Sequence, residues 1–329
     1  MLPAHPFNDL AGWIEQAAVL PALYRLGLMQ WSELSFGWTL VALYGLFQMA
    51  LTVALCVPLE RRFPIETHDD RRGIRVDILY TALARIGILP VATFVLFYAA
   101  QVRLDGLLAD HGYVPPMLET MIPALFGHPI ATFALYALIL DFADYWRHRL
   151  SHRFRAWYAL HAVHHAQRQM TVWSDDRNHL LDEIIGLLWF MAVGLAIGIP
   201  PLQFPVLVLA LRFVEAFSHA NIRLSFGTIG ERLLVSPRFH RAHHGLLAAG
   251  QRSVNYGAVF PCWDMIFGTA DFSSGFPRTG DDDAPEAMAT GGWLAQQRAG
   301  LTALAHMLPR ALHRVLHRVF PWTGRENLP

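Results

Sequence analysis

The chain has 329 residues, which is long enough for a large folded core or for several membrane spans. Hydrophobic residues make up 54% of it and charged residues only 16%, below the share usual for a soluble domain. The formal net charge is zero, so nothing indicates a nucleic-acid partner. The two cysteines form no CxxC pair and indicate neither a disulfide framework nor a thiolate metal site.

The first hundred residues contain apolar stretches with the length of membrane helices. Residues 8–30 predict a mixed helix, either interfacial or a first span with polar ends. Residues 36–58 carry no charge and are long enough to cross a bilayer. The next predicted span, 78–100, contains Arg85 and Pro90. An arginine there marks either a polar site or a side chain that snorkels toward the arginine-rich side.

A third apolar stretch, 129–146, follows a polar loop over 101–127 and leads into the histidine-rich part of the chain. The run 184–217 is interrupted by prolines at 200, 201 and 205, which predicts a hairpin of two short limbs. Arginines concentrate in the loop 59–75 and after the third stretch, so the positive-inside rule orients the histidine-bearing end toward the cytoplasm. We therefore predict an all-α, polytopic integral membrane bundle with a histidine-rich metal site at its cytoplasmic face.

Ten of the 17 histidines lie in less than a third of the chain and have helical spacing. They are His148, His152, His161, His164, His165, His179, His219, His240, His243 and His244. Side chains at i, i+3 and i+4 project from one helix face, so three such clusters can converge. Neutral imidazole suits iron, copper, zinc and nickel, and eight or more imidazoles exceed the need of one ion. The spacing predicts a two-metal centre, and the repeated HxxHH triplet indicates two half-sites, one for each metal.

Polar residues near the clusters are candidates for supporting roles. Asp144, His148 and His152 are four residues apart and share a helix face. Asp144 could accept the second N–H of a ligand histidine or bind metal itself; the alternative is a capping or interfacial charge. Asn221 could support His219 in the same way. We take Asp144 and Asn221 as candidate catalytic residues and the ten histidines as candidate metal ligands.

The combination HxxxH, HxxHH, His-x-Asn and HxxHH resembles the fatty acid hydroxylase / sterol desaturase superfamily of membrane non-haem di-iron enzymes. Supporting matches are Asp141–Trp146 before the first cluster, Asn255–Gly257 after the last, and Trp263–Thr269. The resemblance covers roughly residues 130–270. It departs from the family pattern at Leu180, where members often carry proline. It differs from the acyl-lipid desaturases, whose first histidine pair usually has four intervening residues instead of three.

The resemblance implies O2-dependent hydroxylation or desaturation of a membrane lipid, such as a sterol or a fatty acyl chain. It implies two iron ions as the cofactor, and zinc would bind the same imidazoles. The electrons must come from an external donor, similar to ferredoxin or to cytochrome b5 with its reductase, because the chain has no flavin, haem or nicotinamide motif. The expected partners are therefore the membrane, a lipid substrate and a redox protein.

Two other functions stay open from the residues alone. A zinc-dependent membrane hydrolase could use the same histidines, with Asp182 and Glu183 near His179 as acid–base groups. A non-catalytic metal or lipid transporter is the third interpretation. The predicted organisation is N-terminal membrane helices over 1–129, a histidine-box domain over 130–271, and a polar loop with amphipathic C-terminal helices over 272–329.

Those C-terminal helices are expected at 292–320, lying on the membrane surface. Their histidines, His306, His313 and His317, are expected on the polar face and not among the ligands.

Overall fold

The structure, a computed structural model, describes residues 6–67, 69–198, 204–247, 251–273 and 275–307. In this part of the chain every regular element is a helix and no β-strand occurs, as predicted. A π-helical turn at Glu15–Val19 joins the first two α-helices, and 3₁₀ turns occupy Met29–Trp31 and Pro123–Leu125. The α-helices are α1 Pro6–Ile14, α2 Leu20–Leu26, α3 Ser32–Arg62, α4 Arg71–Arg85, α5 Ile88–Asp110, α6 Leu118–Met121, α7 Pro129–Arg153, α8 Arg155–His165, α9 Leu180–Ile197, α10 Phe204–His219, α11 Gly227–Leu233, α12 Pro237–His243, α13 Cys262–Phe267, α14 Glu286–Thr290 and α15 Trp293–Met307.

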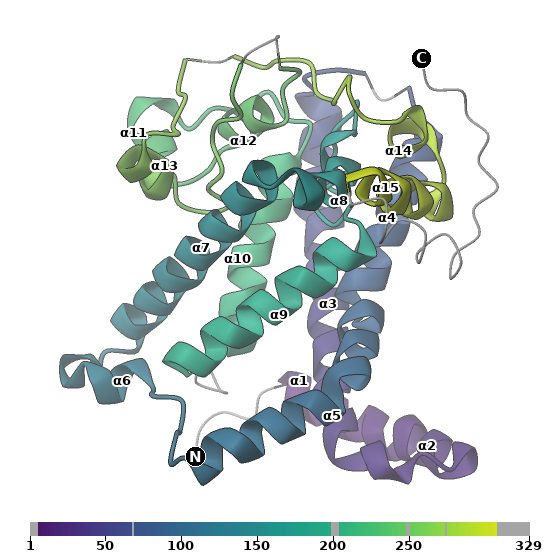
Figure 1. The fold of residues 1–329 in the computed structure, drawn as a ribbon, viewed down its shortest axis with the longest axis vertical. Coiled ribbons are helices and arrows are strands. Elements are labelled where there is room, and N and C mark those ends of the chain that lie inside the picture. The colour runs from purple at the N-terminus through teal and green to yellow at the C-terminus, as the bar shows by residue number, and fades with distance from the viewer. Residues whose placement is uncertain (1–5, 68, 199–203, 248–250, 274, 308–329) are drawn as a thin grey trace.

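Three helical segments of the described chain are long and apolar enough to cross a membrane. They are Met29–Arg62, which contains α3, then α5, and then α9. Only 6% of the apolar windows in α5 and α9 is buried inside the protein, so most of their side chains keep some exposed surface, as those of lipid-facing helices do. Helices α3, α9 and α10 extend to one side of a layer that contains α8, α12 and α15 (Figure 1).

The second predicted span is divided between two helices, so its predicted range is wrong. Helix α4 ends at Arg85 and α5 begins at Ile88. Between them Gly87 has a φ of 88°, the left-handed conformation that glycine adopts without steric cost. Helix α5 then continues to Asp110, through residues that the sequence assigned to a loop. The local signal for the break is the glycine rather than Pro90, which lies in the first turn of α5, where proline is tolerated.

The side chain of Arg85 is buried in a polar site, so the snorkelling alternative is wrong. Its guanidinium donates to Asp175 at 2.5 Å, to Asp176 at 2.8 Å and to Gln48 at 3.1 Å. These acceptors offset the cost of removing the charge from water. Helix α3 approaches closely at this point because Gly45 has no side chain: a Cβ there would lie 1.7 Å from the Arg85 carbonyl oxygen.

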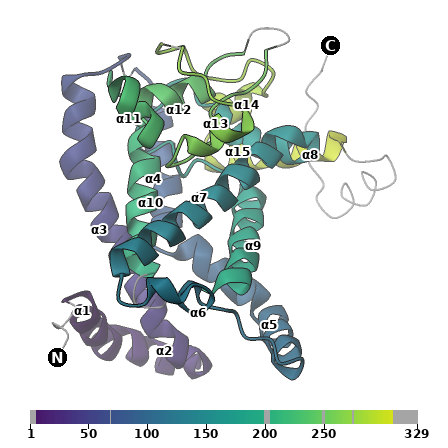
Figure 2. The ribbon, with the colours of Figure 1, turned by 90° about the vertical axis from the view of Figure 1, so that its left-hand side faces the viewer.

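The helices that carry histidines meet at one end of the bundle. Helix α7 runs toward this end, α9 runs away from it, and α10 returns to it (Figures 1 and 2). The two limbs α9 and α10 form the predicted hairpin; its connecting prolines at 200 and 201 lie outside the described residues. Because the chain returns, the end of α10 and the following α12 lie beside α7 and α8.

The C-terminal helix α15 packs against the protein, which differs from the predicted position on the membrane surface. It lies along α8 and also contacts α4 and α14. Its buried face includes Gln296, Gln297 and Gly300. Tyr80 on α4 donates to Gln296 at 2.9 Å and accepts from Gln297 at 2.9 Å. The remaining predicted C-terminal helix, with His313 and His317, lies outside the described residues.

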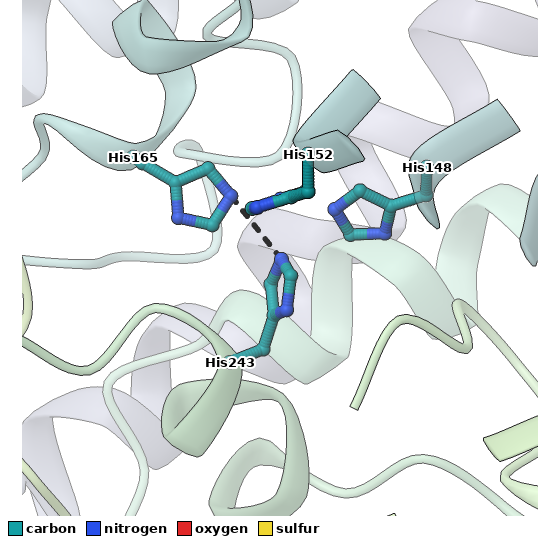
Figure 3. Close-up of side chains that lie close together, drawn as sticks. All are labelled: His148, His152, His165 and His243. Atoms are coloured by element: carbon teal, nitrogen blue, oxygen red, sulfur yellow. Dashed lines mark hydrogen bonds between the residues drawn. The ribbon is translucent and has the colours of Figure 1, made fainter. Parts of the chain in front are cut away.

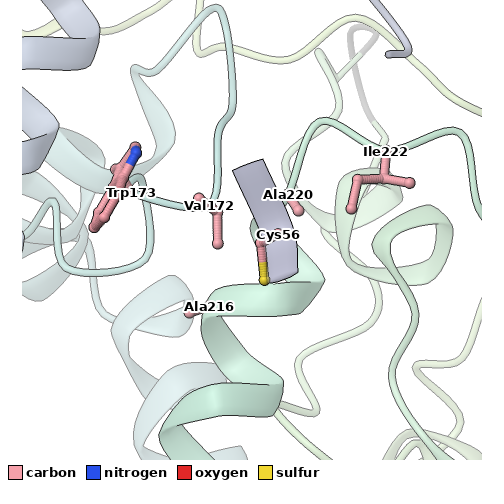
Figure 4. Close-up of a cluster of buried hydrophobic side chains, with 6 residues drawn as sticks. All are labelled: Cys56, Val172, Trp173, Ala216, Ala220 and Ile222. Atoms are coloured by element: carbon pink, nitrogen blue, oxygen red, sulfur yellow. The ribbon is translucent and has the colours of Figure 1, made fainter. Parts of the chain in front are cut away.

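A small apolar cluster joins the long membrane helix to the histidine-bearing layer. Cys56 from α3 packs among Val172 and Trp173 of the loop after α8 and Ala216, Ala220 and Ile222 at the end of α10 (Figure 4). Cys56 is fully buried and is a free thiol. Burial of these side chains ties three segments that are far apart in sequence into one core.

Candidate metal centre

Nine of the ten predicted histidines lie together in the structure. They come from α7, α8, α10 and from α12 with the residue that follows it. Eight of the nine are buried and His152 is partly buried. They divide into two groups of four whose ligand atoms lie within 4.8 Å of one another, with His161 between them. The first group is His148, His152, His165 and His243, and the second is His164, His219, His240 and His244.

The first group combines α7, α8 and α12. Its four imidazoles point toward one another, and the Nε2 atoms of His165 and His243 lie 3.1 Å apart (Figure 3). The rings of His148 and His243 have centroids 4.4 Å apart, and those of His152 and His165 are 4.6 Å apart.

The second group combines α8, α10 and α12. The Nε2 atom of His219 lies 3.0 Å from that of His240 and 3.3 Å from that of His164, and the Nε2 atoms of His240 and His244 are 3.2 Å apart. Each HxxHH triplet therefore contributes to both groups. This differs from the expectation of one half-site for each triplet. The reason is that adjacent residues such as His164 and His165 point about 100° apart on a helix.

These spacings fit a shared metal ion. Two imidazole nitrogens that bind one ion at about 2.1 Å lie roughly 3.0–3.4 Å apart, depending on whether the geometry is octahedral or tetrahedral. The four Nε2···Nε2 distances, 3.0, 3.1, 3.2 and 3.3 Å, all lie in this range. In addition, the Nε2 atoms of His148, His152 and His161 are buried and have no hydrogen-bond partner. Buried polar atoms without a partner are costly, and metal coordination would satisfy them. The donor set therefore fits two metal ions.

The second ring nitrogen of several histidines is bound to a carbonyl, which fixes the tautomer. His148 Nδ1 donates to the Tyr256 carbonyl at 2.9 Å, and His243 Nδ1 donates to the Val254 carbonyl at 2.7 Å. His219 Nδ1 donates to the Glu215 carbonyl at 2.8 Å. Each of these rings therefore presents an unprotonated Nε2 to its group, as a metal ligand must.

Burial also favours the neutral imidazole. Desolvation lowers the pKa of His243 to about 3, and desolvation together with neighbouring imidazoles holds the pKa values of His164, His165, His240 and His244 well below the usual range. At neutral pH these rings are unprotonated and available as ligands.

His161, the histidine between the two groups, is bound by the carboxylate of Asp182 on α9. Asp182 Oδ2 accepts from His161 Nδ1 at 2.8 Å, and its Oδ1 accepts from Trp157 Nε1 at 2.7 Å. The Nε2 atom of His161 is thereby left with a free lone pair. Asp182 was considered in the sequence only as an acid–base group for a hydrolase; its position three residues after His179 gave no direct signal that it contacts His161.

Two other carboxylates build the loop that supplies the carbonyl acceptors. Asp264 accepts from the backbone N–H of Tyr256 at 2.8 Å and of Gly257 at 2.7 Å, and from the hydroxyl of Thr269 at 2.6 Å. Asp141 accepts from the backbone N–H of Val259 at 2.9 Å. The Asn255–Gly257 and Trp263–Thr269 motifs thus fold a loop whose carbonyls orient His148 and His243, which explains their occurrence beside the clusters.

Asp144 does not take the position that the sequence predicted. Its carboxylate forms an ion pair with Arg147, three residues later on α7, at 2.6 Å. Two other carboxylates lie at clustered histidines: Asp182 Oδ2 is 2.8 Å from His161 Nδ1, and Asp175 Oδ1 is 3.5 Å from His219 Nδ1. Asp144 shares a helix face with His148, but its short side chain reaches the neighbouring guanidinium.

Asn221 also has a different role from the predicted one. Its side chain accepts from the backbone N–H groups of Ile65 at 3.2 Å and Glu66 at 3.3 Å, and donates to the Glu66 carbonyl at 2.8 Å. It thus holds the loop after α3, while the Nδ1 of His219 is bound by the Glu215 carbonyl one turn earlier. The His-x-Asn motif joins the end of α10 to a membrane helix.

His179, predicted as a ligand, belongs to neither group of four histidines. Its Nδ1 accepts from the backbone N–H of Leu181 at 3.0 Å and caps α9, and its Nε2 donates to the Gln297 carbonyl at 2.9 Å. Both ring nitrogens are therefore used, and neither is free to bind metal.

We expect His179→Ala to keep the full metal content and to lower stability. The variant loses an N-terminal cap, which typically costs about 1 kcal/mol. It also leaves the buried Gln297 carbonyl without its donor. Metal analysis and a thermal unfolding midpoint, both compared with His179→Asn as the cap-preserving control, test this. Loss of one metal ion from either variant would show that His179 is a ligand.

A cavity lies beside residues that hold two of the clustered histidines, His161 and His219. It has a volume of about 440 Å³ and lies between α7, α9 and α10. Asp182, which holds His161, is part of its wall, as is Glu215, whose carbonyl holds His219. The opposite part of its wall is apolar and includes Leu187, Phe190, Met191, Val208 and Leu211.

Fold and site together define a helical membrane protein with paired histidine groups. Residues 133–269, less than half of the chain, match the family model described as fatty acid hydroxylase. The resemblance to the fatty acid hydroxylase / sterol desaturase superfamily is confirmed.

Several curated proteins are similar over this region. Alkylglycerol monooxygenase of Homo sapiens is 30% identical over 132 residues, which are 40% of this chain and 28% of that protein. Methylsterol monooxygenase 2-1 of Arabidopsis thaliana is 31% identical over 153 residues, 42% of this chain and 55% of that protein. The chain thus spans less than a third of the alkylglycerol monooxygenase and about half of the methylsterol monooxygenase. No solved structure matches it significantly.

Proposed function

We propose that this protein is an oxidoreductase that uses two iron ions and dioxygen to hydroxylate a membrane lipid. The observation that carries the proposal is the pair of four-histidine groups, with Nε2 atoms spaced for two shared ions. The names of the similar proteins, monooxygenases of alkylglycerol and of methylsterol, support a lipid as the substrate. Desaturation of the lipid is the alternative reaction, and the labelling experiment described below distinguishes it from hydroxylation.

Iron bound by the two groups would supply the reduction of dioxygen to an oxidant strong enough to attack an unactivated C–H bond. The residues of the chain bind and orient it. Asp182 and the carbonyls of Glu215, Val254 and Tyr256 hold protons on Nδ1 and direct the Nε2 lone pairs inward. Burial of the groups excludes bulk water.

The cavity between α7, α9 and α10 would bind the lipid. It adjoins the histidine site through Asp182, which contacts His161, and through Glu215, whose carbonyl contacts His219, and its apolar part lies along the membrane-type helix α9. A lipid could therefore reach it from the bilayer. We place the histidine groups at the cytoplasmic side, because Arg61, Arg62 and Arg71 flank the loop that Asn221 ties to this end of the bundle.

The reaction consumes dioxygen, two electrons and two protons for each lipid, and releases water. The electrons would come from a separate protein similar to ferredoxin or to cytochrome b5 with its reductase. The expected result is that purified protein with iron oxidises a lipid only when both dioxygen and an electron donor are present.

Isotopically labelled dioxygen distinguishes the possible reactions. Hydroxylation puts the label into the lipid, whereas desaturation consumes dioxygen without labelling it, so oxygen uptake is followed in parallel. Lipid hydrolysis in the absence of dioxygen would contradict the proposal and favour a zinc-dependent hydrolase. Metal content is measured in the same samples, because zinc binds the same imidazoles.

A further inference from the structure

A tyrosine lies against the partly buried edge of the first histidine group. Tyr158 is on α8, and its ring centroid is 5.3 Å from that of His152 and 6.2 Å from that of His165. Its ring also packs on the apolar cluster that includes Val163 and Met288, which fixes its position. His152 is the one partly buried member of the nine clustered histidines, so Tyr158 lies where the metal centre comes nearest to the surface.

The hydroxyl of Tyr158 is bound to a carboxylate that water can reach. It donates to Asp281 Oδ2 at 2.8 Å, within the range of about 2.6–3.2 Å in which a positioned base can take a proton. Asp281 Oδ1 accepts from the backbone N–H of Asp283 at 2.9 Å, which holds the carboxylate in place. Asp281 is partly exposed and Asp283 is exposed, so a proton on Asp281 can exchange with water.

Two other tyrosines near the first group have no such proton acceptor. The ring of Tyr256 is 5.3 Å from that of His152, but its hydroxyl donates to the Ser253 carbonyl at 3.0 Å. The hydroxyl of Tyr145 accepts from the guanidinium of Arg149 at 2.9 Å. Neither a carbonyl nor a guanidinium takes up a proton at neutral pH. Of these three tyrosines, only Tyr158 combines contact with the histidines and a base at its hydroxyl.

A phenol with a base at its hydroxyl is a good one-electron reductant for a strong oxidant. The O–H bond of a phenol is weaker than an unactivated C–H bond, so an oxidant that attacks the C–H bond can also oxidise tyrosine. Loss of the electron makes the phenol strongly acidic, and the reaction is therefore easiest when a base accepts the proton. Without a lipid to attack, such an oxidant would react with its own ligands, and the surrounding protein must prevent this.

We propose that Tyr158 is a redox-active residue that protects the metal centre by reducing it by one electron when no lipid is bound, with Asp281 as the acceptor of the phenol proton. The inference rests on the proposed function, which supplies the oxidant. The Tyr158 O–H bond breaks, the electron passes to the dioxygen-oxidised iron of the first group, the proton passes to Asp281 Oδ2, and a neutral tyrosyl radical remains.

The phenol is then restored from outside the site. The external electron donor supplies one electron to the radical, and Asp281 returns the proton. Asp281 lies beyond residues 133–269, which match the family model, so the pair joins the matched region to a segment outside it.

The radical itself is the readout of the test. The iron-loaded full chain, in detergent micelles without added lipid, is reduced with stoichiometric dithionite, mixed with oxygenated buffer and frozen for electron paramagnetic resonance. We expect a tyrosyl radical in the unmodified protein and in Tyr256→Phe, and none in Tyr158→Phe, which keeps the ring and loses the hydroxyl. A radical that persists in Tyr158→Phe, or that disappears only in Tyr256→Phe, contradicts the proposal.

Variants of the carboxylate test its part in the step. Asp281→Asn should slow radical formation by about 100-fold or more, because an amide cannot take the proton. Asp281→Glu keeps a base and should restore most of the rate, which a merely structural hydrogen bond would not predict. An equal rate in Asp281→Asn and the unmodified protein would exclude Asp281 as the acceptor.

The protective effect is measured on the protein itself. Metal content should be the same in Tyr158→Phe as in the unmodified protein, because Tyr158 supplies no ligand atom to either group. After exposure of the reduced iron-loaded samples to dioxygen, peptide mass spectrometry should find more oxidised histidine in the first group of Tyr158→Phe. Equal oxidation of the two proteins would refute the protective role.

A second experiment does not depend on the proposed function. The zinc-loaded chain, whose metal is redox-inert, is illuminated with ruthenium tris(bipyridine) and persulfate, which oxidise tyrosines directly. Tyr158→Phe should remove one component of the radical spectrum, and Asp281→Asn should diminish the same component; a spectrum unchanged in both would show that the pair is not redox-active.

Oxygen uptake is recorded in the iron-loaded samples, so the two kinds of failure are distinguishable. Absence of uptake contradicts the proposed function, and the zinc-loaded chain then still decides whether Tyr158 and Asp281 form a redox-active pair. Uptake without a radical that depends on Tyr158 overturns this inference alone.

Discussion

The metal lost from a double histidine variant should depend on which of the two groups the residues belong to, and not on how close they are in the sequence. His164→Ala with His219→Ala affects one group and should leave roughly half of the bound metal, since each group needs its own set of ligands. His164→Ala with His165→Ala changes two adjacent residues that belong to different groups, and should remove nearly all of it. Metal analysis of the purified variants measures both results, and activity should be lost in each.

The exposed His111 provides the control, because His111→Ala should retain full metal content. The opposite pattern, in which the adjacent pair leaves half of the metal and the distant pair leaves none, would show that each HxxHH triplet binds its own ion. It would thereby refute the division seen in the structure.

Asp182→Asn should weaken metal binding and activity by about 10–100-fold, the usual effect of removing a carboxylate that orients a ligand histidine. Asp182 accepts the His161 Nδ1–H at 2.8 Å, and an amide has a weaker acceptor and can turn its own donor toward that proton. Chelator competition measures metal affinity, and lipid oxidation measures activity.

Asp144→Asn is the matched comparison. Its carboxylate pairs with Arg147 at the edge of the cavity, so this variant should leave metal affinity unchanged. A loss of metal affinity in Asp144→Asn, with none in Asp182→Asn, would restore the role that the sequence suggested for Asp144.

The fold could be predicted in outline because the length of the apolar runs and the position of the charges indicate where long helices begin and end. The uncharged run 36–58 is sufficient to identify a membrane-length helix, and its structural counterpart is α3. The predicted single span over 78–100 is wrong because Gly87, in the left-handed conformation, divides it into two helices. Hydropathy alone does not reveal such a residue. Likewise, the amphipathic pattern of 293–307 does not reveal whether its apolar face packs on a membrane or on α8.

The candidate site was predictable as a set of residues but not as an arrangement. Helical spacing identified nine histidines that the structure brings together, because i, i+3 and i+4 positions share a helix face. The same reasoning included His179, because spacing does not show that both of its nitrogens contact the backbone. It selected Asp144 over Asp182 because only Asp144 is near a cluster in sequence.

The sequence by itself determined the donor set of the candidate site: imidazole donors in helical registers, in a chain apolar enough for a membrane, are local properties. Tertiary structure decided which donors share an ion, which carboxylate supports them, and where a lipid could bind. These depend on how α7, α8, α10 and α12 meet, and that contact is set by packing between segments tens of residues apart. Helix geometry alone sets the 100° offset between His164 and His165, but only the packing of the helices decides which partners each ring meets.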